Sequence, residues 1–229
     1  MGRAIVNKTA RRLTDIVIGV PGRWFLRNLI VHPLARLLYK IEVANIEAGL
    51  SIKNGAVIVA RHLSRMDAIL LVDAAWRFAR VRPTAWWREY DHWAQYWVML
   101  LTGAVRMGSD KTLPPDVRAE QTAWTKEVLS KLLKAGWGVL IFAEGGIGDG
   151  KMVVVPRYLT GIHDIVVAHP DKPVLLVQMQ MPEKASFWQR QRVIVTLERV
   201  DGFSTAGGPA GVNKRLEDHF NNVPVTLAA

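Results

Sequence analysis

The residues of this chain best suited to chemistry lie in segment 61–71, which reads RHLSRMDAILL. Ser64 can cap a helix whose first turn holds Asp67, in a capping-box arrangement. A turn before that helix can bring the His62 imidazole within reach of the Asp67 carboxylate. A carboxylate bonded to one ring nitrogen fixes the tautomer and stabilises the imidazolium formed when the other nitrogen takes a proton. The pattern therefore predicts His62 as a general base for a hydroxyl group.

The same spacing also has a plain structural interpretation. Asp67 can serve only as a helix cap, and His62 can be a surface loop residue, because capping residues are common at helix starts. Spacing alone does not choose between the two.

Short runs that are apolar throughout predict the strands that position this segment. Continuous apolar runs of this length are typical of strands that are covered on both faces in a largely parallel sheet. These runs span residues 56–60, 139–143 and 174–177. A further stretch, 192–200, mixes polar and apolar residues and is expected nearer an edge of the sheet.

Apolar residues at helical spacing lie between the first two runs. They are Trp93, Trp97, Leu100 and Leu101 in one predicted helix, and Trp124, Val128 and Leu132 in a second. Gly136 is a stop signal for the second helix, because glycine readily adopts the left-handed conformation of a helix end. Alternating strands and helices indicate an α/β fold, here with a mostly parallel central sheet flanked by helices. Residues 202–211 are expected to form a flexible loop before a short C-terminal helix.

Polar residues follow two of the predicted strands directly. Arg61 and His62 follow the run 56–60, and Glu144-Gly145-Gly146 follows the run 139–143. Ligand sites of open α/β sheets lie beyond the carboxyl ends of the strands. We therefore expect these residues to meet at one edge of the sheet.

Four motifs in order resemble those of the glycerolipid acyltransferase family, which includes the 1-acylglycerol-3-phosphate acyltransferases. His62 and Asp67, separated by four residues with Ser64 among them, resemble the first motif, and 142–146 (FAEGG) resembles its Phe-Pro-Glu-Gly-Thr motif. Segment 101–105 (LTGAV) resembles the start of the second motif, and 172–177 (KPVLLV) resembles the fourth. Each motif is loose, but the ordered set covers more than half of the chain.

The resemblance implies transfer of a fatty acyl group to a hydroxyl of a lysophospholipid such as 1-acylglycerol-3-phosphate. The donor is an acyl-CoA or acyl carrier protein thioester that acts as a co-substrate, so no separate cofactor is expected. His62 takes the acceptor's proton, and Asp67 orients the imidazole. Glu144, Gly145 and Gly146 shape the acceptor pocket beside Ser64.

The departures from the family pattern concern the acceptor. The family usually has Asn where this chain has Arg61, and its phosphate-binding arginines align with Ser109 and Ile147. Cations at shifted positions can replace them, or the acceptor lacks a phosphate there. The candidate replacements are Arg61, Arg106, Lys111, Lys151 and Arg157. Two alternatives stay open, namely an acyltransferase with a non-phosphate acceptor and a non-catalytic lipid-binding relative.

Charge and apolar residues are concentrated in the N-terminal part of the chain. The whole chain carries a net charge of +10, and residues 1–40 hold eight basic residues against one acidic residue, a net of +7. No uncharged apolar run there approaches the about 20 residues that span a bilayer. Basic heads beside aromatic and aliphatic side chains favour an amphipathic helical membrane anchor over residues 1–45. An ordinary amphipathic helix pair packed on the core fits the same pattern.

We therefore expect an acyltransferase-like domain over residues 46–229, bound peripherally to the cytoplasmic face of a membrane. No nucleic-acid partner is expected, because the basic segment is too apolar for a plain phosphate-binding arm. The chain has no cysteine, which excludes disulfides, thiolate metal sites and a cysteine nucleophile. The histidines lack metal-ligand spacing, so no metal site is expected.

Overall fold

A computed structural model describes residues 29, 32–50, 52, 54–64, 66–75, 78, 80–86, 99, 102–107, 114–145, 152–157, 159–181 and 190–222. These residues build a seven-stranded sheet in the order β1-β7-β6-β2-β5-β3-β4. Its strands are β1 (Tyr39–Ala44), β2 (Ala56–Ala60), β3 (Val81–Trp86), β4 (Val105–Met107), β5 (Gly138–Phe142), β6 (Val174–Gln180) and β7 (Gln191–Val200). Neighbouring strands are parallel except for β6 and β7, so the expected α/β fold with a mostly parallel sheet is confirmed.

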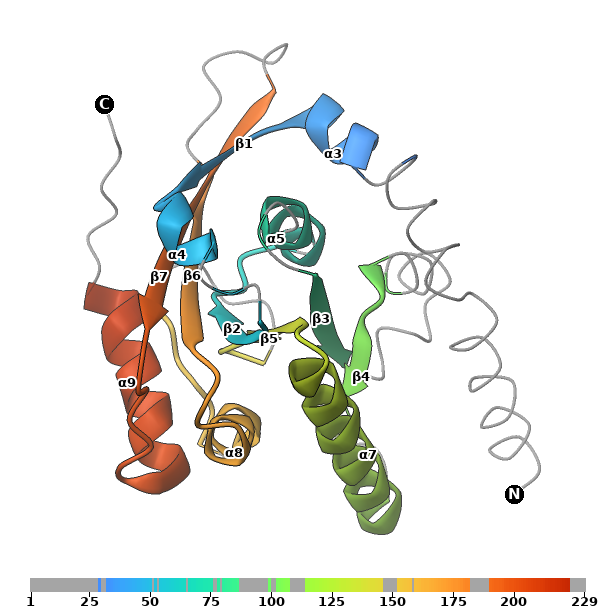
Figure 1. The fold of residues 1–229 in the computed structure, drawn as a ribbon, viewed down its shortest axis with the longest axis vertical. Helices are drawn as coiled ribbons and strands as arrows, with labels where there is room; N and C mark the ends of the chain where they lie inside the picture. Colours follow the sequence, from blue (N-terminus) through green and yellow to red (C-terminus); the bar gives the residue numbers. More distant parts are fainter. Residues whose placement is uncertain are drawn as a thin grey trace, which may run out of the picture.

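Helices cover both faces of this sheet. They are α3 (His32–Leu38), α4 (Ile46–Leu50), α5 (Asp67–Ala75), α7 (Pro115–Lys134), α8 (Gly161–Ala168) and α9 (Gly208–Asn222). Figure 1 shows α5 on one side of the sheet and α7, α8 and α9 on the other.

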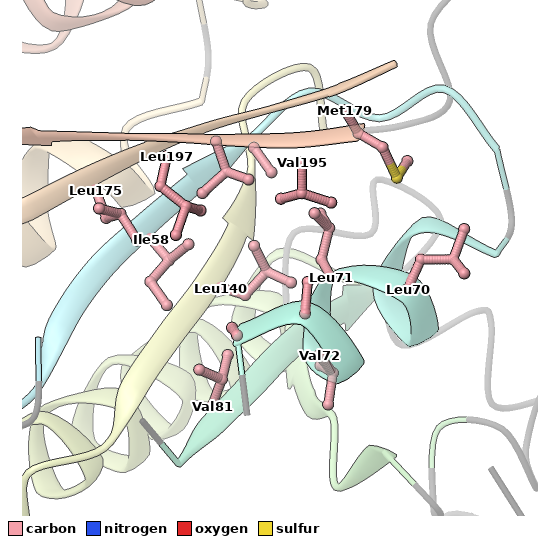
Figure 2. Packing of buried hydrophobic residues seen from close by; sticks show 14 of the residues in the cluster. Ile58, Leu70, Leu71, Val72, Val81, Leu140, Leu175, Met179, Val195 and Leu197 are labelled. Atoms are coloured by element: carbon pink, nitrogen blue, oxygen red, sulfur yellow. The ribbon is translucent and has the colours of Figure 1, made fainter. Parts of the chain in front are cut away.

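Side chains of the central strands alternate between two apolar clusters. In β2, Ile58 packs in the cluster under α5, whereas Val57 and Val59 pack in the cluster under α7, α8 and α9. Figure 2 shows the first cluster, where Leu71 of α5 lies close to Leu140 of β5. Burial on both faces explains why these strands are continuous apolar runs.

The predicted strands and helices correspond to observed elements with some shifts. The predicted strands 56–60, 139–143, 174–177 and 192–200 correspond to β2, β5, β6 and β7, and β7 lies next to the edge strand β1. The predicted second helix is α7, and Gly136 beyond its end has φ 79. The loop predicted over 202–211 was too long, because α9 already begins at Gly208. The predicted helix around Trp93 and Trp97 lies outside the described residues.

The buried face of α7 is offset by one position from the predicted one. Thr125, Leu129 and Leu133 are buried, whereas Trp124 is 37% exposed. Burial of Thr125 is tolerated because its hydroxyl oxygen lies 2.8 Å from the backbone oxygens of both Arg106 and Gln121 and can donate its hydrogen to either.

The N-terminal element differs in part from the predicted helical one. Residues 1–28 lie outside the described part, and α3 is helical, but Tyr39–Ala44 form β1 and pair with β7. The sheet domain thus begins before residue 46. Among the described residues, no helix is both long and apolar enough to cross a membrane.

Candidate active site

Two parallel central strands deliver the candidate site residues to one edge of the sheet. Ala60, the last residue of β2, is in register with Phe142, the last residue of β5. The backbone nitrogen of Ala143 still donates to the oxygen of Ala60 at 3.0 Å. The segments that follow the two strands therefore start side by side, as the sequence predicted.

Asp67 is the polar centre of the turn between β2 and α5. Its side chain is fully buried, and its Oδ2 lies 3.1 Å from Nδ1 of His62. Oδ2 also accepts from the backbone nitrogens of Leu63 at 2.5 Å and Ser64 at 2.8 Å, while the Ser64 hydroxyl donates to Oδ1 at 2.5 Å. These four partners satisfy the buried carboxylate and fix its orientation.

Ser64 also supports the first turn of α5. Its Oγ accepts a hydrogen bond from the backbone nitrogen of Met66 at 3.2 Å. Its backbone oxygen accepts from the backbone nitrogen of Asp67, also at 3.2 Å. The predicted contact between His62 and Asp67 is present, whereas α5 begins at Asp67, so Ser64 lies in the turn before the helix instead of at its N-cap.

His62 is held from two further directions. Its ring stacks on Phe142 with centroids 4.2 Å apart and an interplanar angle of 20°. Its backbone nitrogen donates to Oε2 of Glu144 at 2.8 Å. If the parallel pairing of β2 and β5 continued, the His62 nitrogen would donate to the carbonyl of Ala143. The Glu144 carboxylate replaces that acceptor at the point where the two strands separate.

This arrangement leaves the second ring nitrogen of His62, Nε2, available as a base. Because the Asp67 carboxylate only accepts, Nδ1 of His62 carries the proton of their hydrogen bond. The lone pair then lies on Nε2, and the His62 side chain is 18% exposed. A ring nitrogen with a lone pair on a partly exposed side chain can take a proton from a ligand hydroxyl.

The other predicted site residues are distributed unevenly. Arg61, Ser64, Glu144 and Gly145 belong to the segments that follow β2 and β5. Lys111, Gly146 and Lys151 lie outside the described residues.

Two of the predicted cations lie in other parts of the fold. Arg106 is buried on β4, which is the outermost strand of the sheet and is separated from β5 by β3. Arg157 is exposed at the end of segment 152–157, whose Val153 and Val155 bond to Asn221 and Glu217 of α9.

Sequence reasoning missed two partners of His62. The stacking of Phe142 and the bond from the His62 backbone to Glu144 both depend on the pairing of β2 with β5. The Phe-Ala-Glu order at the end of a predicted strand was the available signal. Within the described segments, no group of three or more His, Asp or Glu side chains is placed to hold a metal ion.

The model of the acyltransferase family matches residues 40–179, which is more than half of the chain. This chain belongs to the acyltransferase family. It is therefore an acyltransferase, and His62, Asp67 and Glu144 all lie inside the matched region of this acyltransferase.

A solved structure supports the fold assignment. The crystal structure of the 1-acyl-sn-glycerophosphate (LPA) acyltransferase PlsC from Thermotoga maritima matches with a TM-score of 0.56 at 18% identity. The match covers 88% of this chain and 79% of that chain. At this identity the likeness establishes the fold of the acyltransferase. A search of curated proteins gave no significant match.

Proposed function

We propose that this acyltransferase moves a fatty acyl group from a thioester, acyl-CoA or acyl carrier protein, to a hydroxyl of a lysophospholipid such as 1-acylglycerol-3-phosphate. The observation that carries the proposal is the hydrogen bond of 3.1 Å between Nδ1 of His62 and the buried Asp67 carboxylate. It prepares Nε2 of His62 to act as the base.

The reaction then proceeds as direct transfer. Nε2 of His62 takes the proton of the acceptor hydroxyl as its oxygen attacks the thioester carbonyl. The new carbon–oxygen bond forms, the carbon–sulfur bond breaks, and the thiol leaves with the proton that the imidazolium returns. The Asp67 carboxylate stabilises the imidazolium between these two steps.

The described part of the N-terminal region supports a membrane-bound acceptor. Leu34, Leu37 and Leu38 of α3 are 51%, 69% and 48% exposed, and Arg36 beside them is also exposed. Apolar side chains next to a cation suit the boundary between acyl chains and acidic headgroups. With the basic residues of 1–28, this favours a peripheral anchor on the cytoplasmic face.

A second candidate is an acyltransferase whose acceptor lacks a phosphate. It is favoured by Ser109 and Ile147, which stand where the resembled family carries phosphate-binding arginines. Donor, base and chemistry are the same in both candidates, so the acceptor alone separates them.

Thiol release by the purified full chain tests the proposal. We expect free thiol to form from acyl-CoA or acyl carrier protein thioester only when lysophosphatidic acid is present, with phosphatidic acid identified by mass spectrometry. Monoacylglycerol is the matched acceptor without a phosphate. Turnover with monoacylglycerol but not with lysophosphatidic acid would support the second candidate, and no turnover with any acylatable lipid would refute both.

A further inference from the structure

Arg61 lies between the end of β2 and His62, and its guanidinium group has an unusual environment. Its Nε and Nη2 atoms are enclosed by protein and have no hydrogen-bond partner. Among the described residues, Arg61 is the only arginine or lysine whose side chain has enclosed nitrogens without a hydrogen-bond partner. By contrast, Arg192 and Arg199 are bonded to Glu42 and Asp201.

An enclosed guanidinium without a partner is costly for the free protein. Arginine stays protonated at any ordinary pH, so the charge cannot be relieved by loss of a proton. Removing a charge from water is unfavourable unless an opposite charge or hydrogen-bond acceptors replace the lost hydration. Such a group is therefore prepared to gain from a bound anion.

The nearest carboxylates along these segments do not supply that anion. Asp67 accepts from His62, Leu63 and both polar groups of Ser64. Glu144 accepts from the backbone of His62. Both acids hold the base in position, and neither bonds to Nε or Nη2 of Arg61, so a ligand can supply the negative charge.

We propose that Arg61 binds the phosphate of the acyl acceptor, an inference that rests on the proposed function. The planar guanidinium presents paired donors that match phosphate oxygens in a bidentate way. It takes the place of the phosphate-binding cation that Ser109 and Ile147 cannot provide.

The position of Arg61 next to His62 favours the acceptor over the donor as the source of the phosphate. Adjacent residues have Cα atoms about 3.8 Å apart, so the two side chains start from the same point at the edge of the sheet. In a lysophosphatidic acid the phosphate and the reacting hydroxyl share one glycerol. In CoA or a carrier protein the long pantetheine arm separates the phosphate from the thioester.

Kinetics of Arg61→Gln with two acceptors provide the first test. The measured quantity is kcat/KM for lysophosphatidic acid divided by kcat/KM for monoacylglycerol. We expect this ratio to be roughly ten- to hundredfold lower in Arg61→Gln than in wild type, because a charged hydrogen bond is lost. The loss should arise mainly in the KM of lysophosphatidic acid, and Arg61→Lys should recover part of it. Arg199→Gln, which removes an exposed arginine from β7, is the matched control and should keep the wild-type ratio.

A binding measurement separates failure of this inference from failure of the proposed function. Calorimetric titration with a short-chain lysophosphatidic acid requires no turnover, so it decides the role of Arg61 even when wild-type protein releases no thiol. We expect Arg61→Gln to bind this ligand roughly ten- to hundredfold more weakly than wild type. Equal affinities and an unchanged acceptor ratio would overturn the inference. An increase in the KM of the acyl-CoA instead would assign the guanidinium to the donor and overturn it as well.

Discussion

The carboxylate of Glu144 accepts a hydrogen bond from the backbone nitrogen of His62 at 2.8 Å, across 82 residues of sequence. It joins the two segments that follow β2 and β5 at the point where the ladder between these strands ends. We infer from this bond that Glu144 helps to position His62. The pocket-shaping role that the family resemblance implies for Glu144 stays a prediction.

Replacing Glu144 by alanine should impair turnover more than binding. Without the carboxylate the His62 backbone can shift, and a shift of about 1 Å at a catalytic group can cost about a hundredfold in rate. We expect kcat to fall roughly ten- to hundredfold in Glu144→Ala, with a smaller loss in Glu144→Gln, which keeps an acceptor oxygen. Steady-state thiol release measures both, and Glu127→Ala on the exposed side of α7 is the control. Wild-type kcat in Glu144→Ala would show that the bond does not position the base.

Asp67→Asn should reduce both the rate and the stability. The amide can no longer stabilise the imidazolium, so we expect kcat to fall by about 10²–10⁴-fold, the range of general-base catalysis. Its NH₂ group also replaces one of the two accepting oxygens in this buried turn, which should lower the free energy of unfolding by about 1–3 kcal/mol.

Kinetics and urea unfolding of the same Asp67→Asn preparation separate the two effects. Asp116→Asn, in the exposed first turn of α7, is the matched control and should change neither quantity. A stable Asp67→Asn variant with wild-type kcat would remove Asp67 from the mechanism.

Stability should decrease in mildly acidic solution because of His169. Burial lowers the pKa of His169 below 6.5, Lys134 and Lys172 act in the same direction, and Asp171 opposes them. Between the lowered pKa and 6.5 the unfolded chain binds a proton that the folded chain does not, so the free energy of unfolding falls as the pH drops. Above 6.5 this contribution is fully present.

Urea titrations from about pH 8 to about pH 5 measure this dependence. His169→Gln should flatten the profile, because the amide does not titrate and can still bond to Ser130, whose Oγ lies 2.9 Å from Nε2 of His169. Burial also lowers the pKa of His219, so His219→Gln should flatten the profile in the same direction. A profile of His169→Gln as steep as that of wild type would assign the acid sensitivity to other groups.

The strands that the sequence revealed are those buried on both faces. β2 and β5 are apolar throughout, and every residue of both is buried. β3 gave no such signal, because Arg82 and Pro83 interrupt it, and its Arg82 side chain donates to the backbone of Gly103. β1 alternates polar and apolar residues at the edge of the sheet, and its pairing with β7 joins distant parts of the chain.

The candidate site shows the same division between local and distant contacts. His62 and Asp67 are five residues apart, so one turn brings them together and their contact was predictable. The contacts of His62 with Phe142 and Glu144 exist only because β2 and β5 are neighbours in the sheet. No local sequence pattern predicts which strands are neighbours. The enclosure of Nε and Nη2 of Arg61 depends on tertiary packing, so the sequence offered Arg61 only as one of five candidate cations.

The rate of acyl transfer by His62→Ala, compared with wild type, tests the central claim most directly. The variant removes the imidazole and leaves Asp67 bonded to Leu63 and Ser64, so the fold should persist, as an unchanged far-ultraviolet circular dichroism spectrum would verify. We expect the rate of thiol release at saturating thioester and acceptor to fall by about 10²–10⁴-fold, because the base is gone. A folded His62→Ala protein that releases thiol at the wild-type rate would contradict the assignment of His62 as the base.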